Sequence, residues 1–404
     1  MKKILFVDDN LEMLQSLKRL LRKMRNDWDM TFVDSGRDAL KLMAANHFDV
    51  IVTDLRMPDV NGLKVLKYVQ KNYPHMVRII LSGEIGKNAG IQLAALAHQF
   101  LAKPVEPDNL IKAIQAQNSI SELVFDKNYQ KVISQIQSLP SFPSLYSEFM
   151  NELNDEDSSS ERVGQIITRD MAMSAKILQL VNSAFFGLPQ YVSSPAQAAV
   201  LLGTETIRDL YFSLKVFSQF DIKKLIHFGL VDLWKHSFEV GIFSKIIAKT
   251  MGLERKVADS AFTSGLLHDI GKLVLAENFP DEYKKTFHIA KRKHITRHKA
   301  EYEVMGIMHG KIGAYLLGLW GLPTPVVEAT AYHHEVSQAG SDKFNLIVIV
   351  HIANGLDHEF NKDHTGIPVS EMDMEYVSQL GLESEIPLFR KNCLENMDNI
   401  GVAQ

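Results

Sequence analysis

The sequence is poor in cysteine, in net charge and in long apolar runs, and each shortage excludes a class of protein. Cys393 is the only cysteine, so no disulfide framework can form within the chain and a reducing compartment is expected. The formal net charge of -4 gives no general attraction for a polyphosphate backbone, so no DNA partner is expected. No apolar stretch reaches the roughly 18 residues of a membrane span. We therefore expect a cytoplasmic protein without a membrane contact.

Two further signals are missing from a chain of 404 residues, a length that suits two or three domains. The opening MKKILFVDDN places two lysines before a short apolar run, but the run ends at Asp8 and Asp9 and forms no signal-peptide core. Beyond residue 140 there is no basic recognition helix, which argues against a transcription factor.

Short β-branched runs alternate with helix-period segments over residues 1–120. The runs KILFV, FDVIVTD, VRIILS and QFLAK predict buried parallel strands, and LEMLQSLKRLLRKM and GRDALKLMAA predict helices between them. This alternation predicts a doubly wound α/β domain with a five-stranded parallel sheet. Its functional site should lie at the carboxyl ends of the strands.

Polar side chains occur at those strand ends. Asp8 and Asp9 close the first strand, Asp54 closes the third, and Ser82 and Lys103 follow the fourth and fifth. Converging carboxylates repel each other, and a hard divalent ion such as Mg²⁺ relieves the repulsion. We predict that Asp54 attacks a phosphoryl group, that Asp8 and Asp9 hold Mg²⁺, and that Lys103 and Ser82 contact the phosphoryl oxygens. The alternative is a set of ordinary strand-end polar residues.

The segments ILFVDDN, VTDLRMPDVNGL, ILSG and FLAKP resemble the receiver domains of response regulators. The resemblance implies that a histidine kinase is the partner that phosphorylates Asp54. It also implies that the Arg56 carbonyl completes the Mg²⁺ shell and that the Lys103–Pro104 peptide is cis. Phe100 matches the aromatic switch position, which couples to Ser82, although a plain core aromatic is the alternative reading.

A long helix is predicted from residue 108 to about 137, and its residues 121–138 form the linker between two domains. The apolar stripe continues through this segment, and Pro140 and Pro143 end it. The helix either packs on the N-terminal domain or pairs with a second copy of the chain, and the sequence leaves both open.

Residues 139–345 are helical in period and predict an all-α output domain, which two short helices in residues 346–404 close. The segments LPSFPSLYSEF, ITRD, VNSAFFG and LLG resemble the HDOD family, an HD-related output domain of bacterial signalling proteins. That resemblance implies a non-hydrolytic regulatory module that acts on an unknown downstream signalling protein. The segment after about residue 355 gives no signal of chemistry.

Histidines in this half occur at spacings that suit a metal site. Imidazoles and carboxylates from several helices can hold Fe or Mn and activate water for phosphoester hydrolysis. Polar residues satisfied within a helical core are the alternative. The candidate residues are Asp232, His236, His268, Asp269, Lys272, His309, His333 and His334.

The same residues resemble the pattern of HD and HD-GYP phosphodiesterases, which hydrolyse cyclic dinucleotides, with Lys272 as the phosphate contact. Two departures favour a vestigial site and an output by protein contact. Asn354 is the best counterpart of the final aspartate ligand, and no GYP segment follows HHEVSQAG. A phosphorylation-controlled cyclic-dinucleotide phosphodiesterase is the alternative. The sequence names no cognate kinase, signal, downstream partner or direction of the phosphorylation effect.

Overall fold

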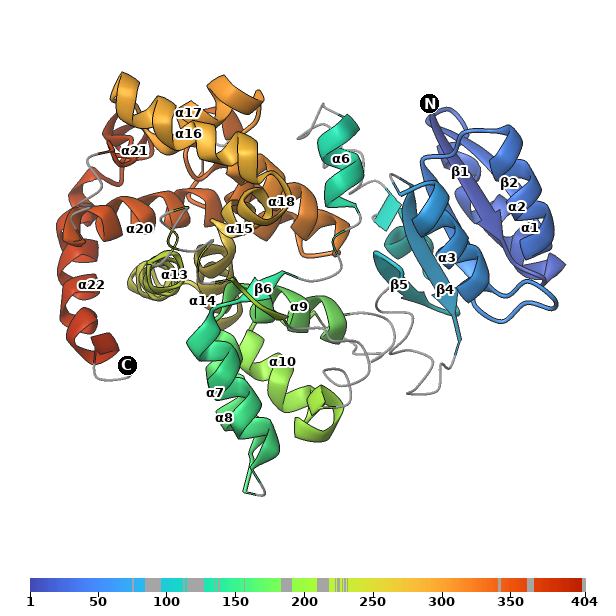
Figure 1. Ribbon diagram of the computed structural model, residues 1–404, viewed down its shortest axis with the longest axis horizontal. Coiled ribbons are helices and arrows are strands. Elements are labelled where there is room, and N and C mark those ends of the chain that lie inside the picture. The colour runs from blue at the N-terminus through green and yellow to red at the C-terminus, as the bar shows by residue number, and fades with distance from the viewer. Residues whose placement is uncertain are drawn as a thin grey trace.

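The computed structural model places an α/β unit and a helical unit on either side of a short helix, α6 (Lys127–Ile133) (Figure 1). The structure describes residues 1–74, 76–83, 96–111, 113–114, 127–134, 136, 139–155, 157–182, 191–208, 218–221, 223, 226, 228, 230, 232–340, 343–361 and 367–401.

The N-terminal unit is a parallel sheet with strand order β2-β1-β3-β4-β5, as the alternation of strands and helices predicts. Its strands are β1 (Lys2–Val7), β2 (Trp28–Val33), β3 (Val50–Asp54), β4 (Val77–Ser82) and β5 (Gln99–Ala102). Its helices are α1 (Leu11–Leu20), η1 (Leu21–Met24), α2 (Gly36–Ala45) and α3 (Gly62–Asn72). The strand that the sequence did not reveal is β2, because it lies at the sheet edge and is largely half-buried.

Side-chain caps begin three of these helices shortly after a strand ends. Asn10 Oδ1 accepts a hydrogen bond from the Met13 amide at 3.1 Å and begins α1. Ser35 and Asn61 cap α2 and α3 in the same way. The chain therefore turns back at each strand end, and the carboxyl ends of β1, β3, β4 and β5 lie along one edge of the sheet.

The C-terminal unit is helical, as predicted, apart from a two-residue parallel pair of β6 (Pro140–Ser141) with β7 (Ser218–Gln219). Its first helices are α7 (Pro143–Asn154), α8 (Ser160–Thr168), α9 (Met171–Val181), α10 (Pro195–Leu202), α13 (Leu233–Thr250), α14 (Arg255–Leu267), α15 (Ile270–Asn278) and α16 (Pro280–Lys293). The later ones are α17 (Arg297–Met305), α18 (His309–Leu319), α19 (Thr324–Tyr332), η2 (Val336–Ala339), α20 (Leu346–Phe360), α21 (Met374–Gln379), η3 (Glu383–Glu385) and α22 (Ile386–Gly401).

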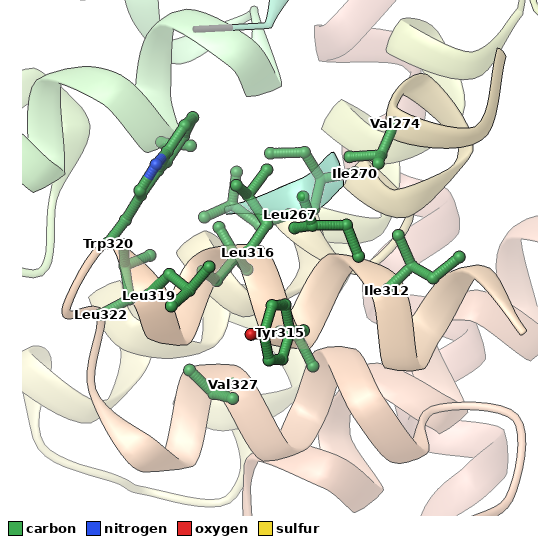
Figure 2. Packing of buried hydrophobic residues seen from close by; sticks show 14 of the residues in the cluster. Leu267, Ile270, Val274, Ile312, Tyr315, Leu316, Leu319, Trp320, Leu322 and Val327 are labelled. Carbon is green, nitrogen blue, oxygen red and sulfur yellow. The ribbon is translucent and has the colours of Figure 1, made fainter. Parts of the chain in front are cut away.

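Helix α18 lies at the centre of the larger core (Figure 2). Its buried residues Ile312, Tyr315, Leu316 and Leu319 recur at helical spacing and pack with residues of α14, α15 and α19. A second core joins α20 to α13, α14 and α22. Helix α20 is therefore an internal part of the helical unit and not only a closing segment.

Only parts of the predicted long helix are described. Residues 107–111 and 113–114 are helical, as is α6, whereas residues 115–126 lie outside the described part of the chain. Much of the predicted VNSAFFG segment lies outside it as well. Among the described helices, none combines the length and apolar character that crossing a bilayer requires.

A substitution at Gly271 tests the close approach of α15 and α18. A Cβ atom at this position would lie 1.9 Å from the His309 carbonyl oxygen. We expect Gly271→Ala to lower the free energy of unfolding by about 1–3 kcal/mol, because the two backbones would have to separate. Urea unfolding followed by fluorescence measures this. Gly83→Ala is the control, since a Cβ there meets no atom within 4 Å, and equal losses in both variants would contradict the prediction.

Candidate functional site

The sheet edge brings together Asp8, Asp54 and Lys103, which we call the strand-edge site. Lys103 Nζ lies 2.7 Å from Asp8 Oδ2 and 2.5 Å from Asp54 Oδ1. Both carboxylates are buried, and the Arg56 amide donates to Asp54 Oδ2 at 2.7 Å. Burial alone would lower the pKa of Lys103, but its contacts with the two carboxylates outweigh burial and raise it. The ammonium is therefore charged at neutral pH and offsets the two buried negative charges.

The other residues predicted for this edge have mixed placements. Asp9 is exposed beside Asp8, and the Lys103–Pro104 peptide is cis. Ser82 ends β4, but its side chain lies outside what the structure describes. Phe100 is partly buried and packs against both the sheet core and the cluster formed by α7 to α10. It therefore contacts both halves of the molecule.

A second cluster forms in the helical half around Asp269, which is fully buried. Asp269 follows His268 at the break between α14 and α15, so adjacent residues of two helices face one site. His309 Nε2 lies 2.9 Å from Asp269 Oδ1, and Lys272 Nζ contacts Asp269 Oδ2. We call the group the histidine cluster. It consists of His236, His268, Asp269, His309, His333, His334, Asp357 and His358.

The imidazoles of the histidine cluster are oriented by acceptors on their outer nitrogens. The Nδ1 distances are 2.6 Å from His236 to Asp357 Oδ2, 2.6 Å from His268 to Gly265 O, 2.7 Å from His309 to Glu301 Oε2 and 2.8 Å from His333 to Thr330 O. Carboxylates and carbonyls only accept hydrogen bonds, so each Nδ1 carries a proton. In the neutral ring the lone pair is therefore on Nε2, and it points into the cluster.

The inward nitrogens fit a metal site. His236 Nε2 lies 3.2 Å from His268 Nε2, so two lone pairs face each other where a shared cation would attract both. Asp269 Oδ1 and His333 Nε2 are buried and accept no hydrogen bond of normal geometry. Three sets of residues could each hold a metal ion, because the ligand atoms within each set lie within 4.8 Å of one another. Asp269 and His236 each belong to two of these sets. Nitrogen and carboxylate donors in this arrangement suit two neighbouring transition-metal ions such as Fe or Mn.

Burial tunes the protonation of these groups. It lowers the pKa of His236 and of His268 to about 4, and it holds the pKa of His333 well below its ordinary value. These three rings are therefore neutral at pH 7 and able to bind a metal. Burial would raise the pKa of Asp269, but Lys272 and the neighbouring histidines outweigh it and keep the carboxylate ionised. His309 is the exception, because Glu301 and Asp269 outweigh its burial and raise its pKa.

The two remaining residues predicted for the metal site, Asp232 and Asn354, differ in placement. Asp232 is exposed at the start of α13 and belongs to none of the three ligand sets. Asn354 is buried, and its Oδ1 has no hydrogen-bond partner among the described residues, while those sets contain only histidines and carboxylates. The carboxylate that reaches the cluster from α20 is Asp357, one helical turn after Asn354. Asn354 as the counterpart of the final aspartate ligand therefore stays a prediction.

Sequence reasoning also missed three supporting residues. Glu301 of α17 holds His309, and His358 stacks on His236 with ring centroids 5.0 Å apart. His351 Nδ1 donates to the His333 carbonyl at 2.7 Å. The pattern Asp-His at 357–358 on an apolar helix was the signal that could have revealed Asp357 and His358.

A cavity of about 770 Å³ opens onto the histidine cluster. It is lined by His236, His309 and His334 and by three basic residues, Lys235, Lys272 and Arg297. The Arg297 guanidinium lies 4.0 Å from the Phe287 ring centroid and donates to Tyr283 Oη at 2.7 Å, which fixes its orientation. The cavity therefore combines possible metal ligands with positive charge.

The fold and the strand-edge site define the class of response regulators, and comparison with known families names both halves. Residues 4–115 match the response regulator receiver domain, and residues 139–336 match the HDOD domain. The chain is therefore a receiver domain followed by an HDOD domain. The HDOD match ends before α20, which supplies Asp357.

Relatives cover the chain in parts. An uncharacterized protein of Treponema pallidum is 25% identical over 66% of this chain and 53% of its own length. The hydrogenase transcriptional regulatory protein HoxA of Bradyrhizobium diazoefficiens is 34% identical over 28% of this chain and 23% of its own. The chain thus spans about half or less of these relatives. The structure of the MmoQ response regulator from Methylococcus capsulatus is 23% identical, covers 63% of this chain and 98% of its own, and has a TM-score of 0.47.

The geometry makes opposite predictions for two aspartates. Asp357→Asn should weaken Mn²⁺ binding by about 10-fold or more, because a carboxylate that holds His236 becomes a neutral amide. Asp232→Asn should bind Mn²⁺ as the unmodified protein does. Calorimetric titration of both variants with Mn²⁺ measures this, with metal content by mass spectrometry as a check. Loss of Mn²⁺ binding in the Asp232 variant alone would show that Asp232 belongs to the metal site, as the sequence predicts.

Proposed function

We propose that the chain is a two-component response regulator in which a histidine kinase phosphorylates Asp54. Three features support this proposal. Asp54 ends a buried strand, Lys103 contacts it, and Asp8 directly follows the neighbouring strand β1 with its carboxylate on the same lysine. Asp8, Asp9 and the Arg56 carbonyl would hold Mg²⁺, which neutralises charge on a transferring phosphoryl group.

For the output half we propose metal-dependent hydrolysis of a phosphodiester, with a cyclic dinucleotide as the expected substrate. One observation carries this proposal, which is the set of Nε2 lone pairs converging on Asp269. The sequence favoured a non-hydrolytic output because Asn354 stands in place of the last aspartate ligand and because no GYP segment follows HHEVSQAG. Against this, Asp357 of the same helix accepts from His236 Nδ1, so it supports that imidazole and adds negative charge beside the cluster.

The protein's own groups would each have a role in hydrolysis. Bound Mn²⁺ or Fe²⁺ would supply an activated water and neutralise phosphoryl charge. Glu301, Asp357 and the helix-end carbonyls hold the imidazoles in the orientation that binding requires. Lys272, Lys235 and Arg297 line the cavity and would attract the phosphate oxygens of a substrate.

A second candidate output is regulation by protein contact, and one observation favours it. Phe100 of the receiver packs against the α7 to α10 cluster. A change in the Phe100 side chain on phosphorylation would alter this shared surface and expose or cover a binding site for a downstream signalling protein. Such an output requires no chemistry at the histidine cluster.

Phosphorylation is tested with acetyl phosphate and Mg²⁺. We expect the protein to gain one phosphoryl group and Asp54→Asn to gain none, because the amide is not a nucleophile. Intact-protein mass spectrometry measures this. Asp59→Asn is the matched control, since Asp59 is exposed five residues further along the chain and should leave phosphorylation unchanged. Equal labelling of the Asp54 variant would place the phosphoryl group elsewhere.

Hydrolysis is tested with cyclic di-GMP and with bis(p-nitrophenyl) phosphate in the presence of Mn²⁺ or Fe²⁺. We expect turnover that falls about 100-fold or more in Asp269→Asn, because this residue is the carboxylate shared between the ligand sets. Acetyl phosphate should change the rate in the unmodified protein but not in Asp54→Asn. A metal-loaded protein that hydrolyses neither substrate, with or without acetyl phosphate, would favour the protein-contact output instead.

A further inference from the structure

Arg78 of β4 is a buried cation whose partners in the described structure are all uncharged. Its side chain is 2% exposed, and its Nε donates to Leu96 O at 2.7 Å. One Nη group donates to Pro74 O and Met76 O, and Nη2 donates to Ser134 O at 3.1 Å. Burial lowers the pKa of Arg78 only to about 10, so the guanidinium remains charged at pH 7. Each backbone carbonyl that accepts a hydrogen bond from Arg78 therefore offsets part of the free-energy cost of burying its charge.

His98 directs a second donor at the same carbonyl. The Arg78 amide donates to His98 Nδ1 at 3.2 Å, so the neutral ring carries its proton on Nε2. That nitrogen lies 2.9 Å from Ser134 O and 2.8 Å from Arg78 Nη2. Burial and the Arg78 charge hold the pKa of His98 well below its ordinary value, so the ring stays neutral. Two donor groups thus share the Ser134 oxygen as their acceptor.

Ser134 directly follows α6, so this contact fixes the linker helix to the receiver. We call Arg78, His98 and Ser134 the linker anchor. The Ser134 hydroxyl also donates to Pro74 O. If α6 moved away, two adjacent buried donors would lose their shared acceptor, which is costly in a dry site. Movement of α6 and a change in the β4 and β5 edge are therefore coupled.

The other side of α6 contacts the helices that carry the histidine cluster. Tyr129 Oη donates to Met305 O at 3.3 Å, and its ring packs edge-on against Phe279 with centroids 4.9 Å apart. Met305 ends α17, and the same helix carries Glu301, which holds His309. Figure 1 shows α6 between the sheet and α18.

The receiver also contacts α18 directly. Gln99 Nε2 of β5 donates to Gly318 O, in the last turn of α18, at 3.4 Å. His309 is the first residue of the same helix. The receiver and its linker therefore touch α17 at its end and α18 in its last turn, and the Glu301–His309 pair joins these two helices.

We propose that the linker anchor and Tyr129 position the Glu301–His309 pair, so that the conformation of the β4 and β5 edge sets the metal affinity of the histidine cluster. The inference rests on the proposed function and adds the route of its regulation. Strands β4 and β5 also lead to the phosphorylation site, since Ser82 ends β4 and Lys103 follows β5. Phosphorylation would act on metal binding through α6, without moving the two domains apart.

The test compares Tyr129→Phe with Tyr302→Phe in the full-length protein. Both remove one hydroxyl, but Tyr302 is 62% exposed on α17, whereas the Tyr129 hydroxyl bonds Met305 O. We expect Tyr129→Phe to weaken Mn²⁺ binding about two- to tenfold, the range of one lost hydrogen bond, and Tyr302→Phe to leave it unchanged. Calorimetric titration measures the affinities, and equal thermal midpoints show that both variants are folded. Unchanged Mn²⁺ affinity in folded Tyr129→Phe would overturn the inference.

Hydrogen exchange separates this inference from the proposed function. In Tyr129→Phe, but not in Tyr302→Phe, amides of residues 301–309 should exchange faster, a readout that needs neither metal nor turnover. Acetyl phosphate with Mg²⁺ should change the same amides in the unmodified protein once mass spectrometry confirms phosphorylation. If the protein bound no Mn²⁺, the proposed metal site would be refuted, and hydrogen exchange alone would then test the coupling between α6 and residues 301–309. Identical exchange in both variants would refute the coupling.

Discussion

Burial of the Asp269 carboxylate is the constraint on which the helical half depends. A buried charge is tolerated only when surrounding groups compensate it, and here Lys272 of α15 and His309 of α18 do so. His268, His236 and His333 surround the same carboxylate as neutral rings. The helices can therefore pack only in the register that delivers these side chains. The same arrangement leaves lone pairs directed inward, which is the requirement for holding metal ions.

The receiver solves a similar problem with fewer groups. Asp8 and Asp54 are buried side by side at the sheet edge, and the Lys103 ammonium compensates both. In each half, a lysine neutralises buried carboxylate charge at the end of a strand or helix that packs into an apolar core. The two sites differ in their other ligands, because the sheet edge offers oxygen atoms and the helical half offers imidazoles. Each site thus suits a different class of ion.

Several features of the chain could be predicted because they depend on local patterns. The β-branched runs gave four of the five strands, and polar residues at the strand ends gave Asp8, Asp54 and Lys103. His268 and Asp269 could be found because they are adjacent. Asp357 could not, since Asn354 one turn earlier on the same helix fits the spacing equally well. Only the packing of α20 against α13 selects which of the two faces His236.

The sequence by itself determined the order of the two domains, the residues at the strand ends and most of the histidines that form the histidine cluster. These follow from periodicity and composition, which act over a few residues. The tertiary structure alone decided that Asp357 holds His236, how Glu301 orients His309, and that Arg78 binds the linker through Ser134. Those contacts join residues that are between 8 and 121 positions apart in the sequence. In the sequence, Arg78 is an ordinary polar residue of a strand, and only its burial in the fold leaves backbone carbonyls as its acceptors.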